Sequence, residues 1–169
     1  MTEIKIKRKI KKTATKTIKC SPKGGGGTVS FEEAMKELKS GMAVQFAPGY
    51  YNIGEVAIFN QSNVIFEGDG SGGFVDMFLI SYGQDVVVRN LNLHTLEVGD
   101  GTVVDSKTYH LTITNGGKAI KTYLYNVGCI WMVAYINKSD LYMQHCTISN
   151  ACQINDDGGN VIQNLAYTT

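Results

Sequence analysis

The sequence predicts an all-β domain made of stacked coils of chain, and three observations support this prediction. Short alternations of apolar and polar residues recur along the chain, as in QDVVVRNLNLHT at residues 84–95. The 19 glycines, only two prolines and many Val, Ile and Thr residues favour strands joined by tight turns. The polar residues that precede the alternations recur at comparable intervals: Asn63, Asp85, His110, Asp140 and Asn160. Repeats of this kind that cannot each bury an apolar face indicate a solenoid, here of about five to six coils.

The segment 84–95 illustrates how one side of a coil is specified. Its residues alternate between the two faces of a strand, which predicts a buried set of Val86, Val88, Leu91 and Leu93. The same pattern predicts an outward set of Val87, Arg89 and Asn92. Residues that tolerate a sharp bend stand five positions after the first three coil anchors: Gly68, Asn90 and Asn115. The longest interval also contains TYLYNVGCIW at residues 122–131, which predicts one further hidden coil.

Residues 1–21 are predicted to form an extended basic arm. Seven lysines and Arg8 against Glu3 give residues 1–20 a net charge of +7, so the total of +1 leaves residues 21–169 with −6. Apolar residues lie on even positions and Lys or Thr on odd positions, which is the period of a strand. A solvated terminus is the alternative interpretation. We expect the arm to lie on an acidic protein surface, or to pair with a neighbouring subunit, through Lys5, Lys7, Arg8, Lys9, Lys11 and Lys12.

A glycine-rich linker at residues 22–29 separates the arm from the predicted β-helix domain at residues 30–169. The glycines do not form a phosphate-binding loop, because the terminal GK[ST] is missing. Ser30 and Glu33 predict a capping box at the start of one short amphipathic helix at about residues 31–39. Gly41 is expected to end it in a C-cap position. Residues 42–47 predict a strand, Pro48-Gly49 a turn and residues 50–58 a second extended segment.

The order of these segments resembles the pectin-lyase-like family of right-handed parallel β-helix proteins. The residues that carry the resemblance are GMAVQFAPGYYNIGEVAI at 41–58, SNVIFEGDGSG at 62–72 and DVVVRNLNLHT at 85–95. The resemblance implies a right-handed, single-stranded parallel β-helix over roughly residues 28–165, with the helix capping its N-terminal end. The family includes pectate and pectin lyases, polygalacturonases and bacteriophage tailspikes, so the fold alone assigns no chemistry.

The two ends of such a β-helix expose unpaired strand edges, which natural proteins cover. Only residues 161–169 follow the last anchor, so we expect a second subunit or another partner to cover that end. The resemblance to phage proteins implies a homotrimer.

The acidic and basic residues of the body do not form a complete catalytic set. We therefore expect no catalytic residues, no bound metal and no cofactor. Asp156 and Asp157 look like the paired carboxylates of a polygalacturonase, but the other motifs of that family are missing, and NDDGG is also an ordinary turn composition. Arg89 is the one arginine of the body and is expected to be exposed and isolated. We expect His94, His110 and His145 to lie on three separate coils. Neighbouring coils could stack two of them, but we favour hydrogen-bonded histidines at turns. Trp131, with Met132 and Tyr135, is either a platform for sugar on the outer wall or, in the interpretation we favour, part of the core or of a subunit contact.

The four cysteines, Cys20, Cys129, Cys146 and Cys152, show no metal-binding spacing and are expected to be buried free thiols. We find no secretory signal and no run of about 20 apolar residues, so we expect a protein made in the host cytoplasm that does not enter a membrane.

These features together predict a non-enzymatic structural protein of a bacteriophage virion. It would be a capsid decoration or cement protein, or a short tail spike or fibre module, attached through its arm. The alternative is a lyase, hydrolase or carbohydrate-binding protein that acts on a surface glycan. Nucleic-acid binding is disfavoured, because the arm has one arginine and no interleaved aromatic residues.

Overall fold

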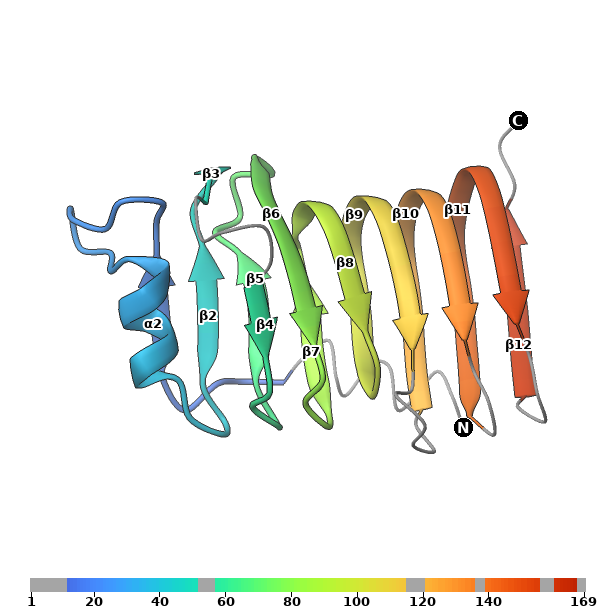
Figure 1. Ribbon diagram of the computed structural model, residues 1–169, viewed down its shortest axis with the longest axis horizontal. Coiled ribbons are helices and arrows are strands. Elements are labelled where there is room, and N and C mark those ends of the chain that lie inside the picture. Colours follow the sequence, from blue (N-terminus) through green and yellow to red (C-terminus); the bar gives the residue numbers. More distant parts are fainter. Residues whose placement is uncertain (1–11, 52–56, 115–120, 136–138, 156–159, 167–169) are drawn as a thin grey trace.

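The computed structural model describes residues 12–51, 57–114, 121–135, 139–155 and 160–166. Its strands stack side by side along one long axis, with the helix at the N-terminal end of the stack (Figure 1). Every pairing between the named strands in these ranges is parallel. This confirms the predicted parallel β-helix of stacked coils.

The strands form two walls. The first wall is the continuous path β1 (Thr17–Cys20), β2 (Ala43–Phe46), β5 (Ile65–Gly68), β7 (Val86–Arg89), β9 (Gly101–Thr114), β10 (Lys121–Tyr135), β11 (Asp140–Asn155) and β12 (Asn160–Ala166). The second wall contains β3 (Gly49–Tyr50), β4 (Ala57–Phe59), β6 (Phe74–Ser81) and β8 (Asn92–Val98), and continues into the later halves of β9, β10 and β11. The long strands therefore bend from one wall into the other.

Left-handed residues make these bends. Asn90 follows β7, and equivalent positions within β9, β10 and β11 hold Asp105, Asn126 and His145, all with φ between 48° and 54°. Asn and Asp tolerate this conformation better than most residues. Asn126 Nδ2 donates a hydrogen bond of 2.6 Å to Asp105 Oδ1, so neighbouring corners are also joined to each other. The predicted left-handed bend at Asn90 is confirmed. Gly68 does not have a left-handed φ, and Asn115 lies outside the described residues.

The predicted phase of the coils is wrong at His110. This residue does not begin a coil, because it lies in the second wall, where it pairs with Thr95 and Trp131. The coil begins instead at Gly101, which pairs with Val86 and with Thr122. The coil between Val86 and Gly101 is shorter than the intervals between the predicted anchors, so the repeat pattern of the sequence does not reveal it. The hidden coil at residues 122–131 is confirmed as part of β10.

The core consists of side chains stacked in columns between the walls. One column runs Leu79, Leu96, Leu111 and Met132 through the second wall, and all four side chains are buried. Aromatic residues fill the N-terminal coils, where the ring centroids of Phe59 and Phe66 lie 4.2 Å apart. Each column is continuous from coil to coil, so every additional coil buries more apolar side-chain surface.

The helix α2 (Phe31–Glu37) covers the N-terminal end of this core. Ser30 and Glu33 form the predicted capping box, which is confirmed. The helix ends earlier than predicted, with Leu38 as its C-cap, and Gly41 instead has a left-handed conformation in the turn before β2. Phe31 packs edge-on against Phe59 at 5.6 Å. No helix in the described ranges is long and apolar enough to cross a membrane.

Candidate functional site

The register of the second wall brings aromatic side chains into line on its outer surface. Phe78, Thr95, His110 and Trp131 occupy one register position in four successive coils. Their chain neighbours Leu79, Leu96, Leu111 and Met132 point into the core, so this position points outward. Thr95 is the one non-aromatic residue at this position, and the neighbouring His94 provides the ring that contacts Phe78 on one side and His110 on the other. We call Phe78, His94, His110 and Trp131 the aromatic row.

The rings of the aromatic row contact each other from coil to coil. Ring centroids are 4.9 Å apart between Phe78 and His94, 6.1 Å between His94 and His110, and 4.7 Å between His110 and Trp131. The last pair is stacked, with 15° between the planes. Phe78 and Trp131 each keep 38% of their surface exposed, so the row is accessible at both ends.

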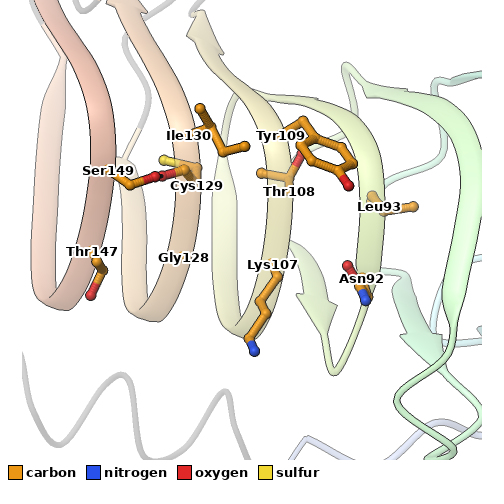
Figure 2. A pocket seen from close by; sticks show the side chains of 10 residues that line it. All are labelled: Asn92, Leu93, Lys107, Thr108, Tyr109, Gly128, Cys129, Ile130, Thr147 and Ser149. Atoms are coloured by element: carbon orange, nitrogen blue, oxygen red, sulfur yellow. Dashed lines mark hydrogen bonds between the residues drawn. The ribbon is translucent and has the colours of Figure 1, made fainter. Parts of the chain in front are cut away.

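A groove of about 290 Å³ lies beside the aromatic row (Figure 2). Its floor follows another register position, Asn92, Lys107, Gly128 and Thr147. Gly128 has no side chain between those of Lys107 and Thr147, which leaves space in the wall. The remaining lining residues are Leu93, Thr108, Tyr109, Cys129, Ile130 and Ser149.

The groove combines hydrogen-bonding groups with one positive charge. Lys107 is exposed and is the one charged residue among those that line the groove. Asn92, Thr147 and Ser149 also line the groove and bring amide and hydroxyl groups to it, and the Ser149 hydroxyl lies 3.4 Å from the carbonyl oxygen of Cys129. Tyr109, 45% exposed, connects the groove to the aromatic row, since its ring lies 5.6 Å from that of His94.

Buried groups below the surface hold these side chains in place. Thr108 Oγ1 lies 3.0 Å from the carbonyl oxygen of His94 and 2.8 Å from that of His110, and joins the two coils that carry these histidines. Cys129 is almost fully buried, and burial raises the pKa of its thiol to about 12. The thiol therefore stays protonated near neutral pH, which makes it a poor nucleophile.

The structure changes the interpretation of several residues that the sequence singled out. Arg89 is not isolated, because Nε and Nη2 each lie 2.7 Å from Glu67 Oε2 and Nη1 donates to the carbonyl oxygen of Lys12. Trp131 is not part of the core, since it is exposed. His94 and His110 do lie on separate coils, but they contact one another, and His145 forms a corner.

The predicted partner-binding residues are only partly visible. Lys5, Lys7, Arg8, Lys9 and Lys11 lie outside the described residues, as do Asp156 and Asp157, so their roles stay predictions. Lys12 is described, and its ammonium group contacts Asn63 and lies 3.7 Å from Asp85 of the same chain. Among the described residues, no group of three or more His, Cys, Asp or Glu side chains could hold a metal ion.

Sequence reasoning missed the groove and the aromatic row as a unit. Lys107 and Gly128 are not part of any sequence motif. His94, His110 and Trp131 are unequally spaced in the sequence, and only the register of the strands places their side chains in one row. The signal that could have revealed them is the short coil between Val86 and Gly101, which sets that register.

Comparison with known proteins gives one structural match. No family model and no curated protein matches the sequence. The fold is similar to the crystal structure of pectate lyase Pel9A, with 15% identity and a TM-score of 0.48. The match covers 82% of this chain and 48% of that structure, so this chain spans about half its length.

The expectation that this protein is not an enzyme is contradicted by that comparison, because the matching structure is a pectate lyase, an enzyme. We therefore correct that expectation. With so few identical residues the likeness concerns the fold, and no activity is transferred from it to this chain.

Proposed function

We propose that the outer surface of β8, β9, β10 and β11 binds an extended polysaccharide. The observation that carries the proposal is the aromatic row next to a groove with amide, hydroxyl and ammonium groups. Aromatic rings provide apolar contact with the C–H faces of sugar rings, and a few polar groups at the edge orient the ligand. The two kinds of group lie along the same coils here, which suits a ligand with both kinds of surface.

The direction of the row favours a linear ligand that follows the long axis of the protein. Neighbouring coils lie about 4.8 Å apart, as parallel strands do. Four aromatic rings on successive coils thus offer repeated contacts to a ligand with a repeated unit. Lys107 adds a positive charge to the groove, which favours polysaccharides with carboxylate or other acidic substituents.

Single-stranded nucleic acid also stacks its bases on rows of aromatic side chains. Such sites combine the rings with a positively charged groove that follows the phosphates. Residues 21–169, which carry the row, have a net charge of −6. This charge disfavours a polyanion with one phosphate per unit and supports a polysaccharide of lower charge density.

Binding to polyuronates and bacterial surface polysaccharides, measured by affinity electrophoresis and calorimetry, tests the proposal. We expect Trp131→Ala to weaken binding about tenfold or more, because it removes one end of the aromatic row. Tyr135→Ala is the matched control, since Tyr135 is 52% exposed on the same strand but outside the row. Equal losses in both variants, or no binding to any of these polysaccharides, would contradict the proposal. Shorter products in the same mixtures would reveal cleavage as well as binding.

We also propose that the protein acts as part of a bacteriophage particle, as a decoration protein or a tail module, and that it is a homotrimer. The support is the charge contrast between residues 1–11, where four lysines and Arg8 against Glu3 give +4, and residues 21–169, which carry −6. A basic segment of this kind suits attachment to an acidic protein surface. Light scattering tests the trimer. Co-sedimentation with particles tests attachment, which should fall when Lys5, Lys7 and Lys9 are changed to Gln. The same change at Lys23, Lys36 and Lys39 is the control.

A further inference from the structure

A second apolar cluster lies on the outer side of the first wall, separate from the core. Ala43, Ile65 and Val87 are register partners in β2, β5 and β7. Their neighbours Val44, Phe66 and Val88 belong to the main core, so these three side chains point outward. They are nevertheless fully buried, at 0%, 1% and 0% exposure. We call Ala43, Ile65 and Val87 the outer column.

The outer column is covered by the chain's own residues 12–16, which we call the strap. Ala14 is the apolar residue that packs against the column. The sequence predicted that Val87 faces outward, and it does so, but beneath the strap. In Figure 1 this blue segment runs across the strands of the first wall rather than along them.

Polar contacts fix both ends of the strap. At the C-terminal end, the Thr15 backbone amide donates to Gly41 O at 2.9 Å, the Ala43 amide donates to Lys16 O at 2.9 Å, and the Lys16 side chain pairs with Glu37. These contacts attach the strap to β2 and the end of α2.

At the N-terminal end, the strap reaches two further coils. Lys12 contacts Asn63 and Asp85, which precede β5 and β7 respectively. Arg89 Nη1 donates to the carbonyl oxygen of Lys12 at 2.8 Å, while the same guanidinium group is paired with Glu67 on β5. This short segment is thus connected to three successive coils, those of β2, β5 and β7.

We infer that the outer column is a docking groove for an extended peptide segment, and that its resident occupant is the strap of the same chain. The groove favours an apolar side chain at the position of Ala14, because that side chain packs directly against the buried column. It selects a cation two residues before Ala14, where Asp85 lies close, and another two residues after it, where Glu37 lies close. The inference does not depend on polysaccharide binding, which concerns the other wall.

Limited trypsin digestion of the full chain tests whether the strap is held in its groove. Cleavage after Lys12 and Lys16 requires the strap to leave the column. We expect Ala14→Asp to increase the rate of cleavage at these two bonds at least tenfold, because a carboxylate cannot be buried against Ile65 and Val87. Ser40→Asp is the matched control, since its side chain is exposed outside the strap and adds the same charge. A milder variant, Lys12→Glu, should accelerate cleavage after Lys16 and keep the column intact if Ala14→Asp fails to fold.

A labelled peptide with the sequence of residues 10–16, which ends before β1, tests whether the groove accepts the segment in trans. We expect saturable binding to the Ala14→Asp protein, whose groove is vacated, and at least tenfold weaker binding to the wild-type protein. A peptide that carries Ala14→Asp itself should not bind either protein. Unchanged cleavage rates in both strap variants, or no peptide binding to a folded Ala14→Asp protein, would overturn the inference. A dimer that dissociates in both strap variants would instead show that the strap of one copy lies on the column of another, and would overturn the assignment to the same chain.

Discussion

Asp105, Asn126 and His145 turn three successive coils from the first wall into the second, each with a left-handed backbone. A side chain with a branched Cβ is strained in this conformation, whereas glycine adopts it freely. The identity of these corner residues therefore follows from backbone geometry, and an exposed position on the surface becomes sensitive to substitution.

Asn126→Val should lower the free energy of unfolding by about 1–3 kcal/mol, because valine is costly in the left-handed region. Asn126→Gly loses the same hydrogen bond to Asp105 but keeps the backbone unstrained, so it should be close to neutral. Urea denaturation of both variants separates the two effects. Equal destabilisation would show that the hydrogen bond, and not the backbone, matters at this corner.

The cysteines differ in their access to solvent, which gives a residue-level test of the core. Cys20, Cys129 and Cys146 are buried, and Cys152 is half-buried. Near neutral pH a thiol reagent should label Cys152 first and the other three at least tenfold more slowly, with all four reacting in denaturant. Peptide mapping identifies the labelled residues. Rapid labelling of Cys20 in the native protein would contradict the placement of β1 in the sheet.

Burial also predicts a pH dependence. It raises the pKa of Cys20 to about 11, above the value of about 8.5 for an exposed thiol. The unfolded chain therefore loses this proton at lower pH than the folded protein. The stability from the buried neutral thiol is complete below about pH 8.5 and falls as pH rises towards the folded pKa. Melting curves of the wild-type protein and Cys20→Ala should converge over that range.

Among the elements, α2 depends strongly on its first turn, since it has seven residues and an isolated helix of that length is not stable in water. The capping box supplies two hydrogen bonds, from Glu33 N to Ser30 Oγ and from Ser30 N to Glu33 Oε2. The bonds that the Glu33 carboxylate accepts from Ser30 lower its pKa, so their contribution is present above the usual carboxyl pKa and is lost as pH falls through the lowered value.

Ser30→Ala should reduce the free energy of unfolding by about 1 kcal/mol at neutral pH. Ser40→Ala, at an exposed position after the helix, should change it little. Guanidinium denaturation measures both values. A loss of similar size in the two variants would show that the cap does not limit the stability of this end of the solenoid.

Elements could be predicted from local patterns, whereas the candidate site could not. The alternating inward and outward side chains of β7, the capping box before α2 and the left-handed Asn90 each reflect a few adjacent residues, and together they indicated the correct fold class. The aromatic row depends on which residues of distant coils pair. That pairing depends on the length of each coil. Because the coil before Gly101 is short, the next coil begins at Gly101 and not at the predicted His110. The arm shows the same limit, because the carboxylate near Lys12 belongs to Asp85, which is far along the chain.

At the scale of the whole molecule, stability comes from columns of side chains that continue through neighbouring coils. Each coil contacts mainly the coils next to it, as in other repeat proteins. A defect in a central coil therefore interrupts the columns on both of its sides, while a defect on the outer surface does not.

Leu111→Ala should cost about 2–5 kcal/mol, because it leaves a cavity between Leu96 and Met132 in the middle of the solenoid. Thr112→Ala, the next residue along β9, points to the outer side and should cost far less. Chemical denaturation with hydrogen exchange gives both the size of the loss and its location. Exchange that increases only at the N-terminal coils would contradict the nearest-neighbour character of the column.

The aromatic row belongs to a wall in which each coil adds one similar step. A duplication of the coil that contains β10 would insert another ring, another stretch of groove and another layer of core, and the existing pairings would be preserved on either side. The protein would lengthen by about 4.8 Å for each such event. Under the proposed function, the length of polysaccharide that contacts the wall would then be set by the number of coils, and it could change by whole coils without the redesign of any one of them.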